Sequence, residues 1–291
     1  MNTTQIQFSS NRVRDVERQF LTALSDIYPE GEIRQMTRML FEAYLGWNTT
    51  TLLLNRESTI NQSDLLKFHW AIEDLKKQRP IQHIIGYTDF YDCRINVTEH
   101  TLIPRPETEE IVQWIASNII SPTRIVDLCT GSGCIAIAMK KQFPQAMVSS
   151  VDVSAEAIKV AKENASQNGV EVDFRQVDIL ADDGWMIPKD TSLIVSNPPY
   201  IKQSESVSMQ RNVLDYEPHL ALFVSDSDPL LFYRRIARMA KEALAEGGKL
   251  VLEINENLGR ETQTMLAEEG YDSHLYQDFR GKDRMVVAWK A

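Results

Sequence analysis

The sequence predicts an α/β protein in which a mostly parallel sheet, covered by helices on both faces, follows a smaller helical bundle. In residues 1–80, apolar side chains recur with a helical period and strand signals are almost absent. After Pro106, short apolar runs alternate with amphipathic segments, as is typical of parallel strands joined by helices. We therefore predict an N-terminal helical bundle (1–80), a β-hairpin linker (81–106) and an α/β domain (107–291).

Three helix-period patterns define the bundle. The first contains Phe20 and Leu24 and ends at the YPEG stretch of 28–31, and the second runs over 33–44 and ends at Gly46. The third begins after Ser63, a plausible cap, and ends before Pro80. In the linker, the pattern changes to short alternating pieces, which predict a hairpin.

In the α/β domain the strands and helices follow one another regularly. We expect strands at 124–128, 147–153, 172–177, 193–195 and 249–254, and helices at 134–141, 155–168, 229–245 and 258–269. Two final strands, 271–276 and 284–289, are joined by a short polar turn and are expected to pair antiparallel. The sheet is therefore parallel except at its C-terminal strand.

The composition is that of an ordinary globular protein, with 43% hydrophobic and 25% charged residues among 291. Apolar runs are far shorter than a membrane span requires, and the polar start is no signal peptide, so we expect a soluble cytoplasmic protein without a membrane partner. We also expect a monomer. The three cysteines lack a CxxC pair and the five histidines are scattered. We therefore expect neither a disulfide framework nor a metal site.

The charge pattern disfavours nucleic acid as a direct partner. The net charge is −10, and the positive and negative residues balance within 1–85, so the acidic excess lies in the remainder. The KKQR stretch at 76–79 is the one obvious basic run. A protein that grips a polyphosphate is expected to present a basic face instead.

A glycine loop follows the strand at 124–128. Small residues at 129–133, Cys-Thr-Gly-Ser-Gly, let a ligand approach backbone N–H groups at the start of the next helix. Asp152 comes at the end of the next strand, where an acid can accept hydrogen bonds from ribose hydroxyls. Gly131, Gly133 and Ala136 also satisfy a loose form of the dinucleotide-binding fingerprint. The loop is therefore compatible with either a nicotinamide dinucleotide or S-adenosylmethionine.

Acids at three successive strand ends favour S-adenosylmethionine. Asp127 lies inside the loop motif, Asp152 follows the second strand, and Asp178 follows the third, where an acid commonly lies beside adenine. These strand ends meet at the carboxyl edge of the sheet, where open parallel sheets bind ligands.

The stretch SNPPY at 196–200 comes at the fourth strand end and reaches the same edge. An amide or exocyclic amine is a poor nucleophile because its nitrogen lone pair is delocalised. The side-chain oxygen of Asn197 and the carbonyl of Pro198 would accept its two N–H hydrogens, and Tyr200 would stack on the planar group. Catalysis would then consist mostly of positioning, without a strong general base.

With these motifs the sequence resembles the release factor N(5)-glutamine methyltransferases, the HemK/PrmC family, over nearly its whole length. The resemblance rests on QRPIQHIIGYTDFYD at 78–92, LIPRPETEE at 102–110, the glycine loop, SNPPYI at 196–201, DYEPHLAL at 215–222, FYRRI at 232–236 and GKDRMVV at 281–287. It implies a Rossmann-like class I fold and methyl transfer from S-adenosylmethionine to the glutamine side-chain amide of the Gly-Gly-Gln motif in class 1 release factors.

The resemblance also implies roles for individual residues. Asn197 and Pro198 are the predicted catalytic residues, and the bundle at 1–80 would help to dock the release factor. Phe90 and Arg105 match residues near the rim of the active site. The predicted cofactor-binding residues are Cys129, Thr130, Gly131, Ser132, Gly133, Asp152, Asp178, Ile179 and Asn197, and the predicted substrate-binding residues are Asn197, Pro198, Pro199 and Tyr200.

Two positions depart from the family pattern. Cys129 replaces the usual first glycine of the loop, and we expect an extended backbone there, without a positive φ, so that cofactor binding survives. The stretch 224–229, VSDSDP, differs from the common glycine-rich GGxDG, which affects the expected local turn.

Two other functions remain open from the residues alone. An adenine-N6 methyltransferase shares the planar-amine chemistry, but it would need cations to hold a nucleic acid backbone. A cofactor-binding interaction protein, with the helical bundle as its working part, would bind the cofactor without turnover.

Overall fold

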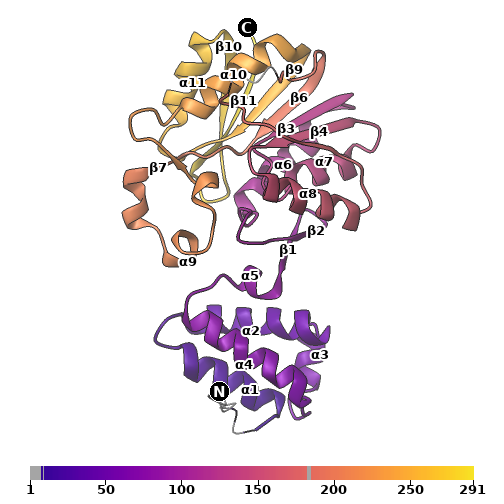
Figure 1. Cartoon of the computed structure of the whole chain (residues 1–291), viewed down its shortest axis with the longest axis vertical. Helices are drawn as coiled ribbons and strands as arrows, with labels where there is room; N and C mark the ends of the chain where they lie inside the picture. The colour runs from indigo at the N-terminus through magenta and orange to yellow at the C-terminus, as the bar shows by residue number, and fades with distance from the viewer. Residues whose placement is uncertain (1–7, 9, 182–184) are drawn as a thin grey trace. The chain divides into compact units, whose positions relative to one another are not determined.

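The computed structural model describes residue 8 and residues 10–181 and 185–291 (Figure 1). The chain forms two compact units, Met1–Gly86 and Tyr87–Ala291. The predicted linker is thus divided between them. Its first residues form a short helix, α5 (Ile81–Ile85), of the first unit, and its hairpin belongs to the second unit.

The regular elements in the described part of the first unit are all helices, as predicted. Its helices are α1 (Val13–Leu24), α2 (Glu30–Leu45), α3 (Thr49–Leu54), α4 (Gln62–Lys76) and α5. Phe68 lies at the centre of the apolar core and is in ring contact with Phe20, Phe41 and Tyr44.

The ends of these helices show the expected signals with one exception. Gly46 ends α2 in the left-handed conformation, with a φ of 69°. The cap of α4 is Asn61 and not Ser63, because the Asn61 side chain accepts a hydrogen bond from the N–H of Asp64 at 2.9 Å. The sequence pattern missed α3 and α5, which are too short to show a helical period.

The second unit begins with the predicted hairpin, β1 (Tyr87–Phe90) paired antiparallel with β2 (Cys93–Asn96). Helix α6 (Pro106–Asn118) follows, with proline at its first position. Strand β2 packs against two helices of the main domain, α7 (Cys134–Gln142) and α8 (Ala155–Gln167).

The large sheet of the second unit is mostly parallel, as predicted. Within the described ranges its strand order is β10-β11-β9-β6-β3-β4-β5. The pairs β3–β4, β4–β5, β3–β6 and β6–β9 are parallel, and β11 is antiparallel to both β9 and β10. The strands are β3 (Arg124–Leu128), β4 (Met147–Asp152), β5 (Asp173–Gln176), β6 (Thr191–Ser196), β9 (Leu244–Glu253), β10 (Tyr271–Gln277) and β11 (Asp283–Lys290).

Helices cover both faces of this sheet (Figure 1). Alternate strand residues face opposite layers: Ile125 joins the core formed with α6, α7 and α8, and Val126 joins the core formed with α10 (Leu231–Ala243) and α11 (Gly259–Glu268). None of the helices in the described ranges is long and apolar enough to cross a membrane.

A long connection between β6 and α10 lies over the carboxyl edge of the sheet. It contains β7 (Ile201–Lys202), η1 (Gln203–Ser208), α9 (Arg211–Leu214), η2 (His219–Ala221) and β8 (Phe223–Val224). The stretch after β8, which departs from the family pattern, still forms a turn. The N–H of Asp228 donates to the carbonyl of Ser225 at 3.2 Å, and the Asp228 carboxylate pairs with Arg234 at 2.9 Å.

Candidate active site

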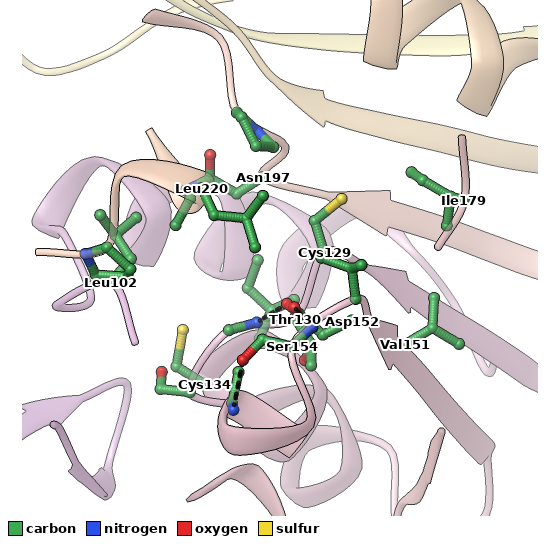
Figure 2. Close-up of a pocket in the computed structure, with 18 of the residues that line it drawn as sticks. Leu102, Cys129, Thr130, Cys134, Val151, Asp152, Ser154, Ile179, Asn197 and Leu220 are labelled. Atoms are coloured by element: carbon green, nitrogen blue, oxygen red, sulfur yellow. Dashed lines mark hydrogen bonds between the residues drawn. The ribbon is translucent and has the colours of Figure 1, made fainter. Parts of the chain in front are cut away.

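The glycine loop and Asn197 come together because β3 and β6 are neighbours in the sheet. Leu128 is the register partner of Ser196, and the hydroxyl of Ser196 donates to the carbonyl of Leu128 at 2.7 Å. The residues that follow these two strands line the pocket of Figure 2. Strand order reverses at this point, which is where open α/β sheets bind ligands.

Hydrogen bonds to the next strand, β4, and to helix α8 hold the loop. The N–H of Thr130 donates to the carbonyl of Val151 at 3.0 Å, and the N–H of Gly131 donates to Asp152 Oδ2 at 2.8 Å. The carbonyl of Ser132 accepts from the buried side chain of Asn164 at 2.9 Å. At Gly133 the φ is 82°, and an added Cβ would lie 2.9 Å from the Cβ of Ala161. This position therefore needs glycine for two separate reasons.

The predicted acids differ in their surroundings. Asp152 accepts from Gly131 and, through Oδ1, from the N–H of Ser154 at 2.9 Å, and burial raises its pKa while these two N–H groups oppose the rise. Each carboxylate oxygen keeps a second lone pair for a ligand. Asp178 is exposed on the pocket wall, and its neighbour Ile179 is buried there.

Asp127 is fully buried and does not line the pocket. Its Oδ2 accepts from the hydroxyls of Thr130 at 2.5 Å and Ser150 at 3.1 Å. Desolvation raises the pKa of this carboxyl to about 7, and the two hydroxyl donors oppose the rise. Asp127 therefore stabilises the loop through its hydrogen bond with Thr130 and does not contact the ligand site.

The structure brings some of the SNPPY residues to the pocket and not others. Asn197 and Pro199 line it, whereas Pro198 and Tyr200 are not among its lining residues. The Tyr200 ring packs against the core beneath α10, and its hydroxyl donates to Glu253 Oε1 at 2.9 Å. Figure 2 shows Asn197 and Leu220 on the side of the pocket away from Ser154 and Cys134 in this view.

Of the two predicted rim residues, one reaches the pocket. Arg105 lines it, and its guanidinium donates to Glu217 Oε1 at 2.5 Å. The buried Glu217 also accepts from the N–H of Ile103 at 3.0 Å, so this acid ties the 102–110 segment to the 215–222 segment. Phe90 is instead buried in the core formed with α6, α7 and α8.

The expected extended backbone at Cys129 was wrong. Its φ is 60°, so the residue lies in the left-handed region and not in an extended conformation. The register of β3 fixes the chain before Cys129, and the bond from Thr130 to Val151 fixes it after Cys129. The backbone between them is therefore left-handed with cysteine as with glycine. Burial raises the pKa of the Cys129 thiol well above its usual value, and the nearby Asp152 and Asp127 raise it further.

Sequence reasoning missed two buried polar residues close to Asn197. Thr108, in the first turn of α6, accepts a hydrogen bond from Asn197 Nδ2 at 3.2 Å. Glu253, the last residue of β9, accepts from the Thr108 hydroxyl at 2.6 Å. A signal for Glu253 was available, because it is another acid at the end of an apolar strand run.

Comparisons with known proteins agree with this arrangement. Residues 108–217 match the methyltransferase small domain family model, and residues 16–86 match the PrmC N-terminal domain. A protein of Flavobacterium psychrophilum named release factor glutamine methyltransferase is 40% identical over 280 residues, which cover 94% of this chain and 98% of that protein. A protein of Bacteroides thetaiotaomicron with the same name is 39% identical, covering 96% of this chain and 99% of the other.

A solved structure, a methyltransferase from Pyrococcus furiosus, matches 67% of this chain and 87% of its own length at 18% identity, with a TM-score of 0.50. The fold and the pocket define a class I S-adenosylmethionine-dependent methyltransferase. Within this class, the near-full-length identity is decisive. The chain belongs to the release factor glutamine methyltransferase family.

The pocket residues fit S-adenosylmethionine as the methyl donor. The glycine loop lets the amino acid part of this ligand approach the backbone. Asp152, which is hydrogen-bonded to that loop, can accept from the ribose hydroxyls, and the apolar wall with Val151 and Ile179 suits adenine.

We predict that Gly133→Ala weakens S-adenosylhomocysteine binding by more than about tenfold, because a left-handed backbone and a close contact with Ala161 both disfavour a Cβ. Calorimetric titration measures the change. Gly169→Ala is the matched control, since Gly169 also has a positive φ, 68°, but an added Cβ there has no atom within 4 Å. Equal affinity of the wild type and Gly133→Ala would contradict the steric argument.

Asp127 should make stability depend on pH. Its native pKa of about 7 lies above the 3.8 of an unperturbed carboxyl, so the native state binds more protons between these values. Its contribution to the free energy of unfolding is then full below pH 4 and is lost as the pH rises towards 7. We predict that Asp127→Asn removes this contribution, so that the free energy of unfolding falls less between pH 4 and pH 7 than in the wild type. Urea titrations of both proteins at several pH values measure the difference, and parallel curves would exclude the effect.

Proposed function

We propose that the protein transfers a methyl group from S-adenosylmethionine to the side-chain amide nitrogen of the glutamine in the Gly-Gly-Gln motif of class 1 peptide chain release factors. The observation that carries this proposal is the position of Asn197 on the pocket wall, next to the glycine loop, in a chain 40% identical to a protein of that name. Adenine methylation is not favoured, because the relatives are named for glutamine.

The residues of the chain contribute mainly positioning. When bound, S-adenosylmethionine supplies a methyl group made electrophilic by its sulfonium charge. The side-chain oxygen of Asn197 and the backbone carbonyl of Pro198 accept the two N–H hydrogens of the glutamine amide and so fix its plane. The amide nitrogen forms the new bond with its lone pair, the electrons of the broken bond remain on sulfur, and one N–H proton passes to solvent. Two oriented acceptors favour this transfer without a strong base.

The experiment is mass spectrometry of a release factor after incubation with the enzyme and the methyl donor. We expect one added methyl on the Gly-Gly-Gln glutamine. Asn197→Ala should reduce kcat at least about 100-fold, as loss of one oriented hydrogen-bonding group commonly does. Its affinity for S-adenosylhomocysteine should stay within about threefold, since the loop bonds to Val151 and Asp152 are retained. A methyl found on DNA or RNA, with none on the glutamine, would exclude the proposed substrate.

The helical bundle at 1–80 is proposed to help dock the release factor. Apolar side chains on its surface support this role: Trp70 is 51% exposed and lies one turn from the partly exposed Leu66 on α4, and Leu53 and Leu54 are exposed on α3. A protein partner that covers these side chains would gain apolar burial.

We therefore predict that Trp70→Ala raises the KM for the whole release factor by about tenfold, and leaves the KM for a short Gly-Gly-Gln peptide unchanged. Truncation of a buried interface tryptophan has an effect of this size. Ile120→Ala in the second unit, where Ile120 is 90% exposed, serves as the control. Steady-state kinetics with both substrates test the prediction, and equal KM values for wild type and Trp70→Ala would rule out this docking surface.

A further inference from the structure

A chain of buried hydrogen bonds ends at Asn197. The Asn197 Nδ2 group donates to Thr108 Oγ1 at 3.2 Å, and the Thr108 hydroxyl donates to Glu253 Oε2 at 2.6 Å. The other carboxylate oxygen of Glu253 accepts from the Tyr200 hydroxyl at 2.9 Å. Thr108 is 2% exposed and Glu253 is 1% exposed, so water does not compete for these bonds.

Three elements bring this group together. Thr108 lies in the first turn of α6, Glu253 ends β9, and Asn197 follows β6. Strands β6 and β9 are parallel neighbours, with Ser196 opposite Leu252, so the residues that follow this pair lie side by side at the sheet edge. The sheet therefore fixes Glu253 relative to Asn197, and Thr108 spans the space between them.

The chemistry of the group gives the chain of bonds a direction. An ionised carboxylate has acceptors and no donor, so both Thr108 and Tyr200 must donate to Glu253. The single hydroxyl hydrogen of Thr108 is then used, and its oxygen can only accept from a third partner. Of the two ends of the Asn197 amide, the NH₂ group alone can meet that requirement. The amide oxygen must point the other way.

We propose that Thr108 and Glu253 are positioning residues that hold the Asn197 carboxamide in the one orientation in which its oxygen accepts a hydrogen bond from the substrate amide. This inference rests on the proposed glutamine methylation. If the Asn197 amide were turned over, its NH₂ group would face the N–H of the substrate and repel it. Glu253 thus acts on the reaction through two intermediate side chains.

The surroundings of Glu253 favour this role over a purely structural one. A fully buried acid costs stability that a packed apolar residue does not. Burial raises the pKa of the Glu253 carboxyl, and Thr108, Tyr200 and then Arg284 oppose the rise. The hydrogen bonds therefore keep the Glu253 carboxylate as an acceptor at a buried position where an apolar side chain would give a more stable protein.

The test begins with Thr108→Val, which keeps the shape of the side chain and removes the oxygen. We expect kcat for a release factor to fall about tenfold or more, while its KM and the affinity for S-adenosylhomocysteine change less than about threefold. Thr108→Ser restores the hydroxyl and should recover kcat to within about threefold of the wild type. Thr262→Val is the matched control, because Thr262 is also fully buried and its hydroxyl donates to the carbonyl of Leu258, at the start of its own helix.

A double-mutant comparison separates positioning from mere structure. In the Asn197→Ala background, Thr108→Val should have less than a twofold further effect on kcat, because the group that Thr108 orients is gone. Glu253→Gln, whose amide can donate, should reduce kcat in the intact background and should not add to Thr108→Val. A kcat of Thr108→Val within twofold of the wild type, or a full multiplicative effect beside Asn197→Ala, overturns the proposal.

A readout without substrate distinguishes this proposal from the proposed function. The side-chain NH₂ resonances of Asn197 in ¹⁵N-labelled protein are assigned by their loss in Asn197→Ala. They should shift in Thr108→Val and in Glu253→Gln but not in Thr262→Val. If the wild type methylates no glutamine, the function fails while this shift still reports the orientation. Unchanged resonances in both variants overturn the orientation even in an active enzyme.

Discussion

The site depends on one constraint, which is that β3 and β6 are neighbours and run in the same direction. Leu128 and Ser196 end these strands side by side, so the glycine loop and Asn197 begin at the same point of the edge. Strand order continues to β4 and β5 on one side and to β9 and β11 on the other. In the proposed reaction, a methyl donor on the loop and an acceptor amide at Asn197 would therefore meet at one point of the sheet edge.

Three buried acids attach separate segments to this edge. Asp127 holds Thr130 in the glycine loop, Glu217 holds Arg105, and Glu253 holds Thr108 and Tyr200. Since a buried carboxyl contributes less to stability than an apolar side chain of the same size, these three acids indicate that the geometry beside the pocket is maintained at some cost to stability.

The features that could be predicted from the sequence are those set by local periodicity or by a strand end. The large strands and helices occur near their predicted positions, and the loop at 129–133, Asp152, Asp178, Ile179 and Asn197 lie on or beside one pocket. Helix α3 was missed because six residues show no helical period. The bond between Thr108 and Glu253 was missed because its partners are 145 residues apart, and only the folded sheet brings them together. Tyr200 was predicted to stack on the substrate amide. Its hydroxyl instead donates to the buried Glu253, and its ring packs against the core beneath α10.

Cys129 shows how the loop accepts a substitution that breaks a local rule. A left-handed φ of 60° costs a non-glycine residue roughly 1–2 kcal/mol. Glycine would avoid that strain, but it would lose the contact of the side chain with the core beneath α10 and would add roughly 0.4–1 kcal/mol of unfolded-chain entropy. These opposing contributions are similar in size, so cysteine is tolerated without a change in backbone path. Because burial raises the pKa of the thiol, it stays neutral and adds no negative charge beside Asp152. The loop therefore keeps its bonds from Thr130 to Val151 and from Gly131 to Asp152 with cysteine at this position.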